Sequence, residues 1–170
     1  MMKSTMKYIS AAALMLAMAA CSNDENLDSA YTNDPDAVRI NATVGEGIPI
    51  TRSNPIGTVE AQATFNTDDQ IAVQAGKQAA VTYQYNGTAW TPVPAGAYLI
   101  WGSNPMNFTA YYPANKNSAS MEAFTLPTDQ STLENLAGAD YMTCTANGVT
   151  KVAAVSLPLT RKTARVVIKT

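Results

Sequence analysis

The chain has 170 residues, of which 46% are hydrophobic and 14% charged, and its 11 basic and 13 acidic side chains leave a formal net charge of -2. A balance so close to neutral gives no electrostatic reason to expect nucleic acid as a partner. The chain has no histidine, which removes the commonest general base, and its two cysteines are too few for a cysteine-rich zinc site. We therefore expect neither a metal site nor a catalytic residue.

The first residues have the organisation of an export signal. Lys3 and Lys7 precede an apolar run over residues 8–20, which is too short to remain as a membrane-spanning helix. The run ends in small residues directly before Cys21, which resembles a bacterial lipobox. We therefore expect a lipoprotein signal peptide over residues 1–20 and a covalent lipid such as palmitate on Cys21, with no other cofactor. The alternative is an ordinary signal peptide followed by an incidental cysteine.

Residues 21–36 contain almost no apolar side chains and are predicted to be a disordered tether with a reach of about 50 Å. The acidic cluster Asp24-Glu25 resembles the signal that sends Bacteroidetes lipoproteins to the outer face of the outer membrane, although a merely solvated linker explains it equally well. Asp28-Ser29-Ala30 is similar to the short O-glycosylation motif of that phylum, which makes Ser29 a possible glycan site.

An alternating pattern begins the folded part, predicted over residues 37–170 as one domain. Arg39, Asn41 and Thr43 fall on one face of this first strand, and the opposite, apolar face holds Val38, Ile40, Ala42 and Val44. This period of two predicts a half-buried strand. The prolines that follow, Pro49 and Pro55, favour a loop in which Arg52 is accessible.

The remaining chain predicts about nine or ten short strands and almost no helix. Asn86-Gly87 and Asn147-Gly148 are each interpreted as a turn between two strands, and residues 128–138 as a helix of two turns at most. Beyond the first strand, the expected strands are 58–65, 71–75, 81–85, 88–90, 97–101, 106–112, 121–126, 141–145, 149–157 and 163–169. The predicted fold class is all-β, an antiparallel β-sandwich of transthyretin-like, Greek-key type, with an eight-stranded barrel as the competing architecture.

Several side chains allow more than one interpretation. The tyrosines and tryptophans of the strands could form a surface for stacking glycans, but core and cross-strand packing is the commoner role. Cys144 is expected to be a buried small hydrophobe, and Asp68-Asp69 to form a turn rather than a calcium site.

The order of motifs along the chain resembles the N-terminal part of Bacteroidetes fimbrillin-like proteins, the major and minor fimbrial subunits. The resemblance covers most of residues 8–170. It rests on the lipobox, the isolated strand ending at Thr51-Arg52, Asp69-Gln70-Ile71-Ala72-Val73, residues 83–90 (YQYNGTAW), residues 108–113 (FTAYYP), Gly138-Ala139-Asp140-Tyr141-Met142, and the closing segments 155–159 and 163–168. Ser53 stands where alanine is more usual, and Gln70 separates Asp69 from Ile71, which departs from the family pattern.

The resemblance implies a route of assembly. Related subunits reach the surface as lipoproteins, an arginine-specific protease cuts after the first strand, and a strand of the next pilin subunit fills the vacated groove. Carried over, the cut falls after Arg52, so that the product begins at Ser53. Residues 37–52, with the apolar face of the first strand, would then be removable. Family members normally carry a second β-domain, and the chain is expected to hold only the N-terminal one.

The favoured hypothesis is a fimbrial (pilus) subunit, or a pilus-associated surface lipoprotein, that contributes to cell adhesion within the fimbrium. The runner-up is a surface lipoprotein that binds glycan or peptide for nutrient uptake. An enzyme is the class least expected, since no paired-carboxylate, Ser-His or Cys-His arrangement can be assembled.

Overall fold

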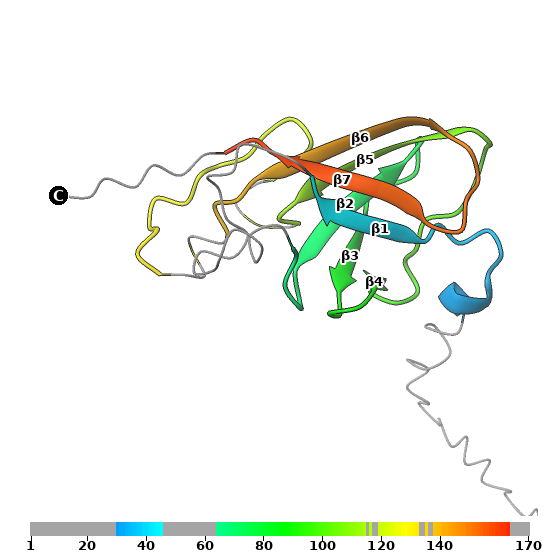
Figure 1. Cartoon of the computed structure of the whole chain (residues 1–170), viewed down its shortest axis with the longest axis horizontal. Helices are drawn as coiled ribbons and strands as arrows, with labels where there is room; N and C mark the ends of the chain where they lie inside the picture. The colour runs from blue at the N-terminus through cyan, green and yellow to red at the C-terminus, as the bar shows by residue number, and fades with distance from the viewer. Residues whose placement is uncertain are drawn as a thin grey trace, which may run out of the picture.

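The computed structural model describes residues 30–45, 64–114, 116, 119–132, 135 and 138–163. These residues form one seven-stranded sheet with the strand order β1-β7-β6-β5-β2-β3-β4, shown in Figure 1. The strands are β1 (Ile40–Val44), β2 (Gln70–Ala75), β3 (Val81–Tyr85), β4 (Trp90–Val93), β5 (Met106–Tyr112), β6 (Met142–Val149) and β7 (Val155–Arg161).

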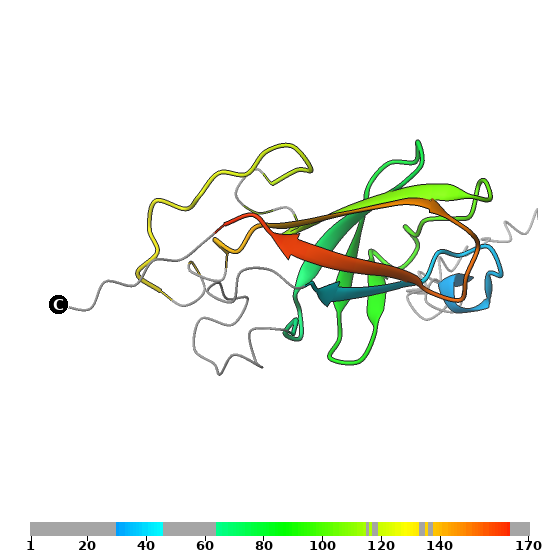
Figure 2. The same cartoon turned by 45° about the horizontal axis from the view of Figure 1, so that its top comes forward.

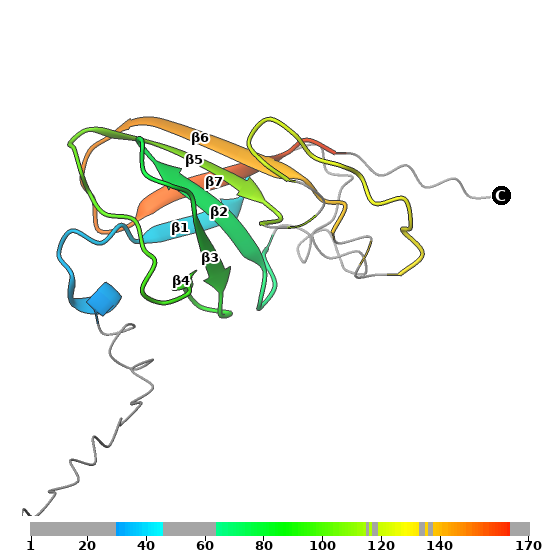
Figure 3. The same ribbon diagram turned by 180° about the vertical axis from the view of Figure 1, so that it is seen from behind.

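The sheet is strongly curled. Its two edge strands, β1 and β4, lie near each other across the core, so that β2, β3 and β4 face β1 and β7 (Figures 2 and 3). The all-β class is confirmed, and the continuous curled sheet is intermediate between the sandwich and the barrel considered from the sequence. One pair departs from the antiparallel expectation, because β1 lies parallel to β7 whereas the other neighbours are antiparallel.

The core lies inside the curl, and in β5 and β7 it is built from alternate residues, as the period of two requires, whereas in β2 the successive residues Ile71, Ala72 and Val73 are all buried. In β5 the buried positions alternate from Met106 to Tyr112, and in β7 they are Val155, Leu157 and Leu159. The largest fully buried side chains include Tyr83 and Phe108. The apolar face predicted for the first strand is likewise on the core side, since Val38, Ile40 and Ala42 are buried.

The first Asn-Gly turn lies one residue further along the chain than predicted. Tyr85 pairs with Trp90, the Asn86 N–H donates to the Ala89 carbonyl at 3.0 Å, and Gly87 with Thr88 occupies the centre. The Asn86 side chain explains the shift, since its Oδ1 accepts from the backbone N–H groups of Thr88 and Ala89 at 2.9 and 2.8 Å. Gly87 has a φ of 94°, a conformation that glycine adopts without steric cost.

The second Asn-Gly pair is not a turn, which corrects the prediction. β6 continues through Asn147 and Gly148, and its register with β5 slips between Met106 and Phe108. One extra residue on β6, with Gly148 at φ 64°, makes this a β-bulge. The Asn107 side-chain oxygen accepts from the Gly148 N–H at 2.7 Å.

Among the described residues, two predicted strands are absent and the first five residues of the predicted helix 128–138 are not helical. Residues 97–101 make only an isolated bridge, from Ile100 to Ala37, and residues 121–126 have no strand partner. Residues 128–132 are not helical. Further along the predicted helix, Asn135 is helical, and residues 133, 134, 136 and 137 lie outside the described residues. Residues 58–63 of the expected strand 58–65 lie outside the described residues. The same holds for residues 164–169 of the expected strand 163–169.

The predicted disordered tether was wrong at its C-terminal end. Residues 30–33 form a helical turn, drawn in blue in Figure 1, and the Tyr31 side chain is 6% exposed. The polar composition of the segment predicted disorder because few apolar side chains could offset the loss of chain entropy on ordering. Burial of the Tyr31 ring offsets that entropy cost.

Candidate functional site

The N-terminal strand β1 is the candidate functional site, and the predicted apolar face of this strand points into the core. Val38 is fully buried, and Ile40 and Ala42 are each 6% exposed. Val44 is half-buried, whereas the alternating side chains of Asn41 and Thr43 are exposed. β1 thus supplies part of the core of the domain. Whether it can be removed stays a prediction.

Within the described residues, β1 has one strand neighbour, β7. Ile40, Ala42 and Val44 lie opposite Val155, Leu157 and Leu159. The Val155 N–H donates to the Arg39 carbonyl at 2.8 Å and the Gly45 N–H donates to the Leu159 carbonyl at 2.7 Å. In a parallel pair, alternate residues carry the ladder, so the backbone groups of the even-numbered residues of β1 point away from β7.

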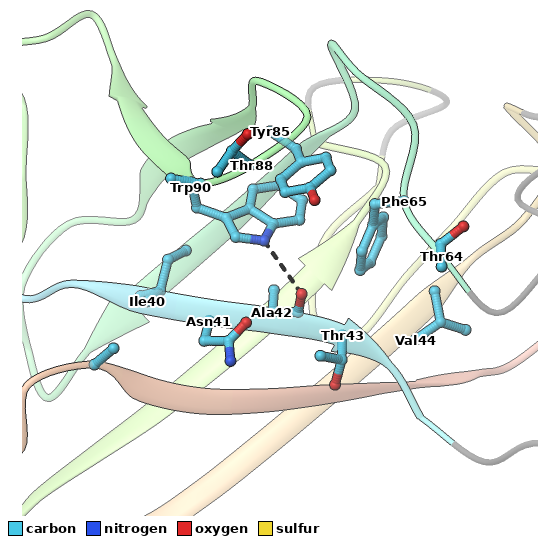
Figure 4. A pocket seen from close by; sticks show the side chains of 12 residues that line it. Ile40, Asn41, Ala42, Thr43, Val44, Thr64, Phe65, Tyr85, Thr88 and Trp90 are labelled. Carbon is cyan, nitrogen blue, oxygen red and sulfur yellow. Dashed lines mark hydrogen bonds between the residues drawn. The ribbon is translucent and has the colours of Figure 1, made fainter.

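Two side chains of the opposite half of the sheet reach the outer edge of β1 and of the residues just before it. The Trp90 indole Nε1–H donates to the Ala42 carbonyl at 3.2 Å, drawn as a dashed line in Figure 4. The Tyr83 hydroxyl donates to the Val38 carbonyl at 3.3 Å and accepts from the Leu99 N–H at 3.2 Å. β1 is therefore held by a strand ladder on one side and by side-chain donors from β3 and β4 on the other.

A pocket of about 460 Å³ lies between β1 and the β3–β4 hairpin. The side chains of Val44, Phe65, Tyr85 and Trp90 line it, with threonines among the other lining residues (Figure 4). The Phe65 and Trp90 rings pack edge to face at 5.0 Å between centroids, and Tyr85 lies 5.2 Å from Trp90. A strand edge that has no strand neighbour within the described residues and lies beside an apolar hollow has the chemistry needed to accept another extended segment.

Packing explains the aromatic side chains better than a glycan surface does. Trp90 is 5% exposed and Tyr83 is fully buried, and both donate to backbone carbonyls of the first strand segment. Trp101 packs edge to face on the buried Phe108 at 5.3 Å. The buried rings of Trp90 and Tyr83 cannot offer a flat face to a sugar, and the half-buried ring of Trp101 is packed on one side.

A group of buried polar side chains lies where β5 and β7 end and β6 begins. Arg161 Nε donates to both oxygens of Asp140 at 3.1 Å, and both side chains are buried. The Tyr112 hydroxyl donates to Asp69 Oδ1 at 3.0 Å. Burial raises the pKa of Asp140 against the opposing effect of Arg161, and burial likewise raises the pKa of Asp69. These groups bond to one another, which indicates a structural role.

The other predicted site residues fall in two groups. Cys21, Ser29, Arg52 and Ser53 lie outside the described residues, so lipidation, glycosylation and processing stay predictions. Cys144 is a buried free thiol in β6, and burial raises its pKa.

Asp68, with φ 71°, lies in the turn before β2 and accepts from Gln84 Nε2, as a turn-forming residue does. The described part of the chain contains no group of three or more His, Cys, Asp or Glu residues that could hold a metal ion. Nor does it contain a helix long and apolar enough to cross a membrane.

Sequence reasoning missed the contacts that fix the chain before β1. Tyr31 packs against Tyr98 with 5.5 Å between ring centroids, and the Tyr98 hydroxyl donates to Asp34 at 3.1 Å. Arg39 Nη2 donates to the Thr32 carbonyl at 2.6 Å. The available signal was Tyr31 itself, which is the single aromatic residue within 21–36.

Comparison with known proteins gives one match. A sequence model of the family described as fimbrillin-like matches residues 41–170, which is most of the chain. No curated protein and no solved structure matches. The family is one of structural pilins, which places the chain among fimbrial, cell-surface proteins with other pilin subunits as the implied partners. Because the family model matches well over half of the chain, the chain belongs to the fimbrillin-like family.

Proposed function

We propose that the protein is a fimbrial subunit, or a pilus-associated surface lipoprotein, that assembles by β-strand addition and contributes to adhesion. In this proposal Cys21 carries the lipid that anchors the chain to the outer membrane, facing outward, and an arginine-specific protease cuts after Arg52. The strand of another subunit then replaces β1. The observation that carries the proposal is that β1 is an edge strand with a buried apolar face.

The energetics support a switch at this strand. Val38 and Ile40 are buried, and burying a large aliphatic side chain contributes about 1.5–3 kcal/mol each. A typical domain is stable by only about 5–15 kcal/mol. Loss of β1 would therefore remove a large fraction of the stability and expose Leu157 and Leu159 of β7, together with the unpaired edge of that strand. A replacement strand with alternating apolar residues restores both.

The choice of Arg52 over Arg39 rests on accessibility. Arg39 is half-buried, its carbonyl accepts from the Val155 N–H, and its guanidinium donates to the Thr32 carbonyl. A protease needs an extended and exposed peptide, which this segment would offer only after local unfolding. Arg52 is the one basic residue between Arg39 and Lys77, so cleavage between β1 and β2 by an arginine-specific enzyme has a single possible position.

The test is to treat the whole folded chain with an arginine-specific protease and follow both the products and the oligomeric state. We expect a new N-terminus at Ser53 and oligomers or fibres that form only after the cut. Arg52→Lys should abolish both, and the matched variant Arg165→Lys should abolish neither. Oligomers that form equally well from Arg52→Lys would overturn strand replacement, and binding of the uncut monomer to a glycan array would favour the nutrient-uptake module instead.

A further inference from the structure

The segment that precedes β1 is fastened to the domain by its own contacts. The Asp34 N–H donates to the Ala30 carbonyl at 3.0 Å and closes the helical turn over residues 30–33. Asp34 Oδ1 then accepts from the Asp36 N–H at 2.8 Å, which fixes the bend that leads into the strand. The direction of entry into β1 is thus set by short-range hydrogen bonds.

Tyr31 and Arg39 join the two ends of this segment. Arg39 reaches back over seven residues to the Thr32 carbonyl at 2.6 Å and over eight to the Tyr31 carbonyl at 3.4 Å. Its guanidinium carbon lies 5.8 Å from the centroid of the Tyr31 ring, over the ring. A guanidinium donates several hydrogen bonds in a fixed plane and is attracted to an aromatic face, so one side chain can make both contacts.

The segment is also fastened to the loop before β5. Tyr31 packs on Tyr98, whose hydroxyl donates to Asp34. Backbone bonds extend the contact, since the Trp101 N–H donates to the Asp36 carbonyl and the Val38 N–H donates to the Leu99 carbonyl, both at 2.8 Å. These attachments lie on the N-terminal side of β1, whereas the proposed cut lies on its C-terminal side.

We propose that residues 30–39 form a clasp that anchors β1 to the domain independently of the chain that follows it. Where processing is concerned the inference rests on the proposed function. After a cut at Arg52 the clasp keeps the severed N-terminal piece in place, so that the groove opens only when an incoming strand displaces β1. The clasp thereby prevents a free subunit from exposing an apolar groove and an unpaired strand edge, a state prone to non-specific association.

The first test uses hydrogen exchange on the whole, uncut chain, and so does not depend on processing. Tyr31→Ala removes the ring on which Arg39 and Tyr98 lie, and we expect exchange over residues 37–45 to rise by at least about tenfold, equivalent to ~1.4 kcal/mol. Exchange in β5 and β6 should be unchanged. Arg39→Lys keeps the charge and should give a smaller rise. The matched control is Asn41→Ala, an exposed residue of the same strand, which should behave like the wild type.

Unchanged exchange over residues 37–45 in Tyr31→Ala would overturn the clasp. So would an equal rise throughout the sheet, which would make Tyr31 a contributor to global stability only.

The second test uses the chain after cleavage at Arg52. Native mass spectrometry should show one species heavier than the uncut protein by a single water, and denaturing conditions should separate it into two pieces. In Tyr31→Ala the smaller piece should dissociate at least about tenfold faster. Immediate loss of that piece from the wild type would overturn the clasp, whereas absence of any cut at Arg52 would overturn the processing step and leave the exchange result to decide the clasp.

Discussion

Truncating Ile40 to alanine tests whether β1 is an integral part of the core. Ile40 lies opposite Val155 of β7 and is 6% exposed. Such truncations in protein cores cost about 2–5 kcal/mol, depending on how far the site collapses or fills with water. Ile40 also lines the open pocket beside β1, so water can reach part of the space that the deletion leaves. We therefore expect the low end of the range, about 2–3 kcal/mol.

The assay is equilibrium unfolding in urea, followed by tryptophan fluorescence, since Trp90 lies against the same strand. The midpoint should fall while the slope stays constant, because a change of stability without a change of exposed surface moves only the midpoint. Asn41→Ala on the exposed face should lie within about 0.5 kcal/mol of the wild type. Equal effects of the two substitutions, or a loss below about 0.5 kcal/mol for Ile40→Ala, would refute the assignment of β1 to the core.

Three further predictions concern other contacts of the sheet. Asp140→Asn should lower the free energy of unfolding by about 3–5 kcal/mol, because it removes the carboxylate that pairs with the buried guanidinium of Arg161. A double variant with apolar residues at both positions should regain most of that stability, and urea unfolding measures both. Trp90→Phe removes the indole donor to the Ala42 carbonyl and should cost about 0.5–1.5 kcal/mol, with faster hydrogen exchange in β1 as the local readout. Burial raises the folded-state pKa of Asp69 above 3.8, so the folded wild type binds a proton more tightly than the unfolded chain does. Lowering the pH through the raised value toward 3.8 should therefore increase the free energy of unfolding of the wild type relative to that of Asp69→Asn, which does not titrate there. Urea unfolding at several pH values measures this difference, and a difference that moves in favour of Asp69→Asn on acidification would contradict the sign.

The local pattern was sufficient for the strand faces but not for every strand. The alternation in β1 predicts which of its side chains are buried, because a strand presents successive residues to opposite faces whatever its neighbours are. Residues 97–101 carry a similar composition, yet they form only a single bridge, from Ile100 to Ala37. Strand formation requires a partner edge, and a sequence pattern does not indicate whether an edge is available.

The two Asn-Gly pairs show the same limit. Asn86 and Asn147 are each followed by glycine, and both pairs use a glycine in the left-handed region. One lies at the end of a hairpin and the other forms a bulge within β6. The dipeptide determines the backbone conformation that is easily reached, whereas the register of the neighbouring strand determines whether the chain reverses there.

The sequence by itself determined the all-β class and the apolar face of the first strand, because both depend on residues that are near one another in the chain, and it determined the similarity to fimbrillin-like proteins, because that rests on the order of motifs along the chain. Only the tertiary structure decided that β1 lies parallel to β7, that Trp90 and Tyr83 reach the outer edge of β1 and of the residues just before it, and that Tyr31 and Arg39 fasten the segment before β1. The pairing of β1 with β7 joins residues 115 positions apart, such as Ile40 and Val155, and the curl of the sheet, which no local pattern encodes, brings Trp90 and Tyr83 to the first strand segment.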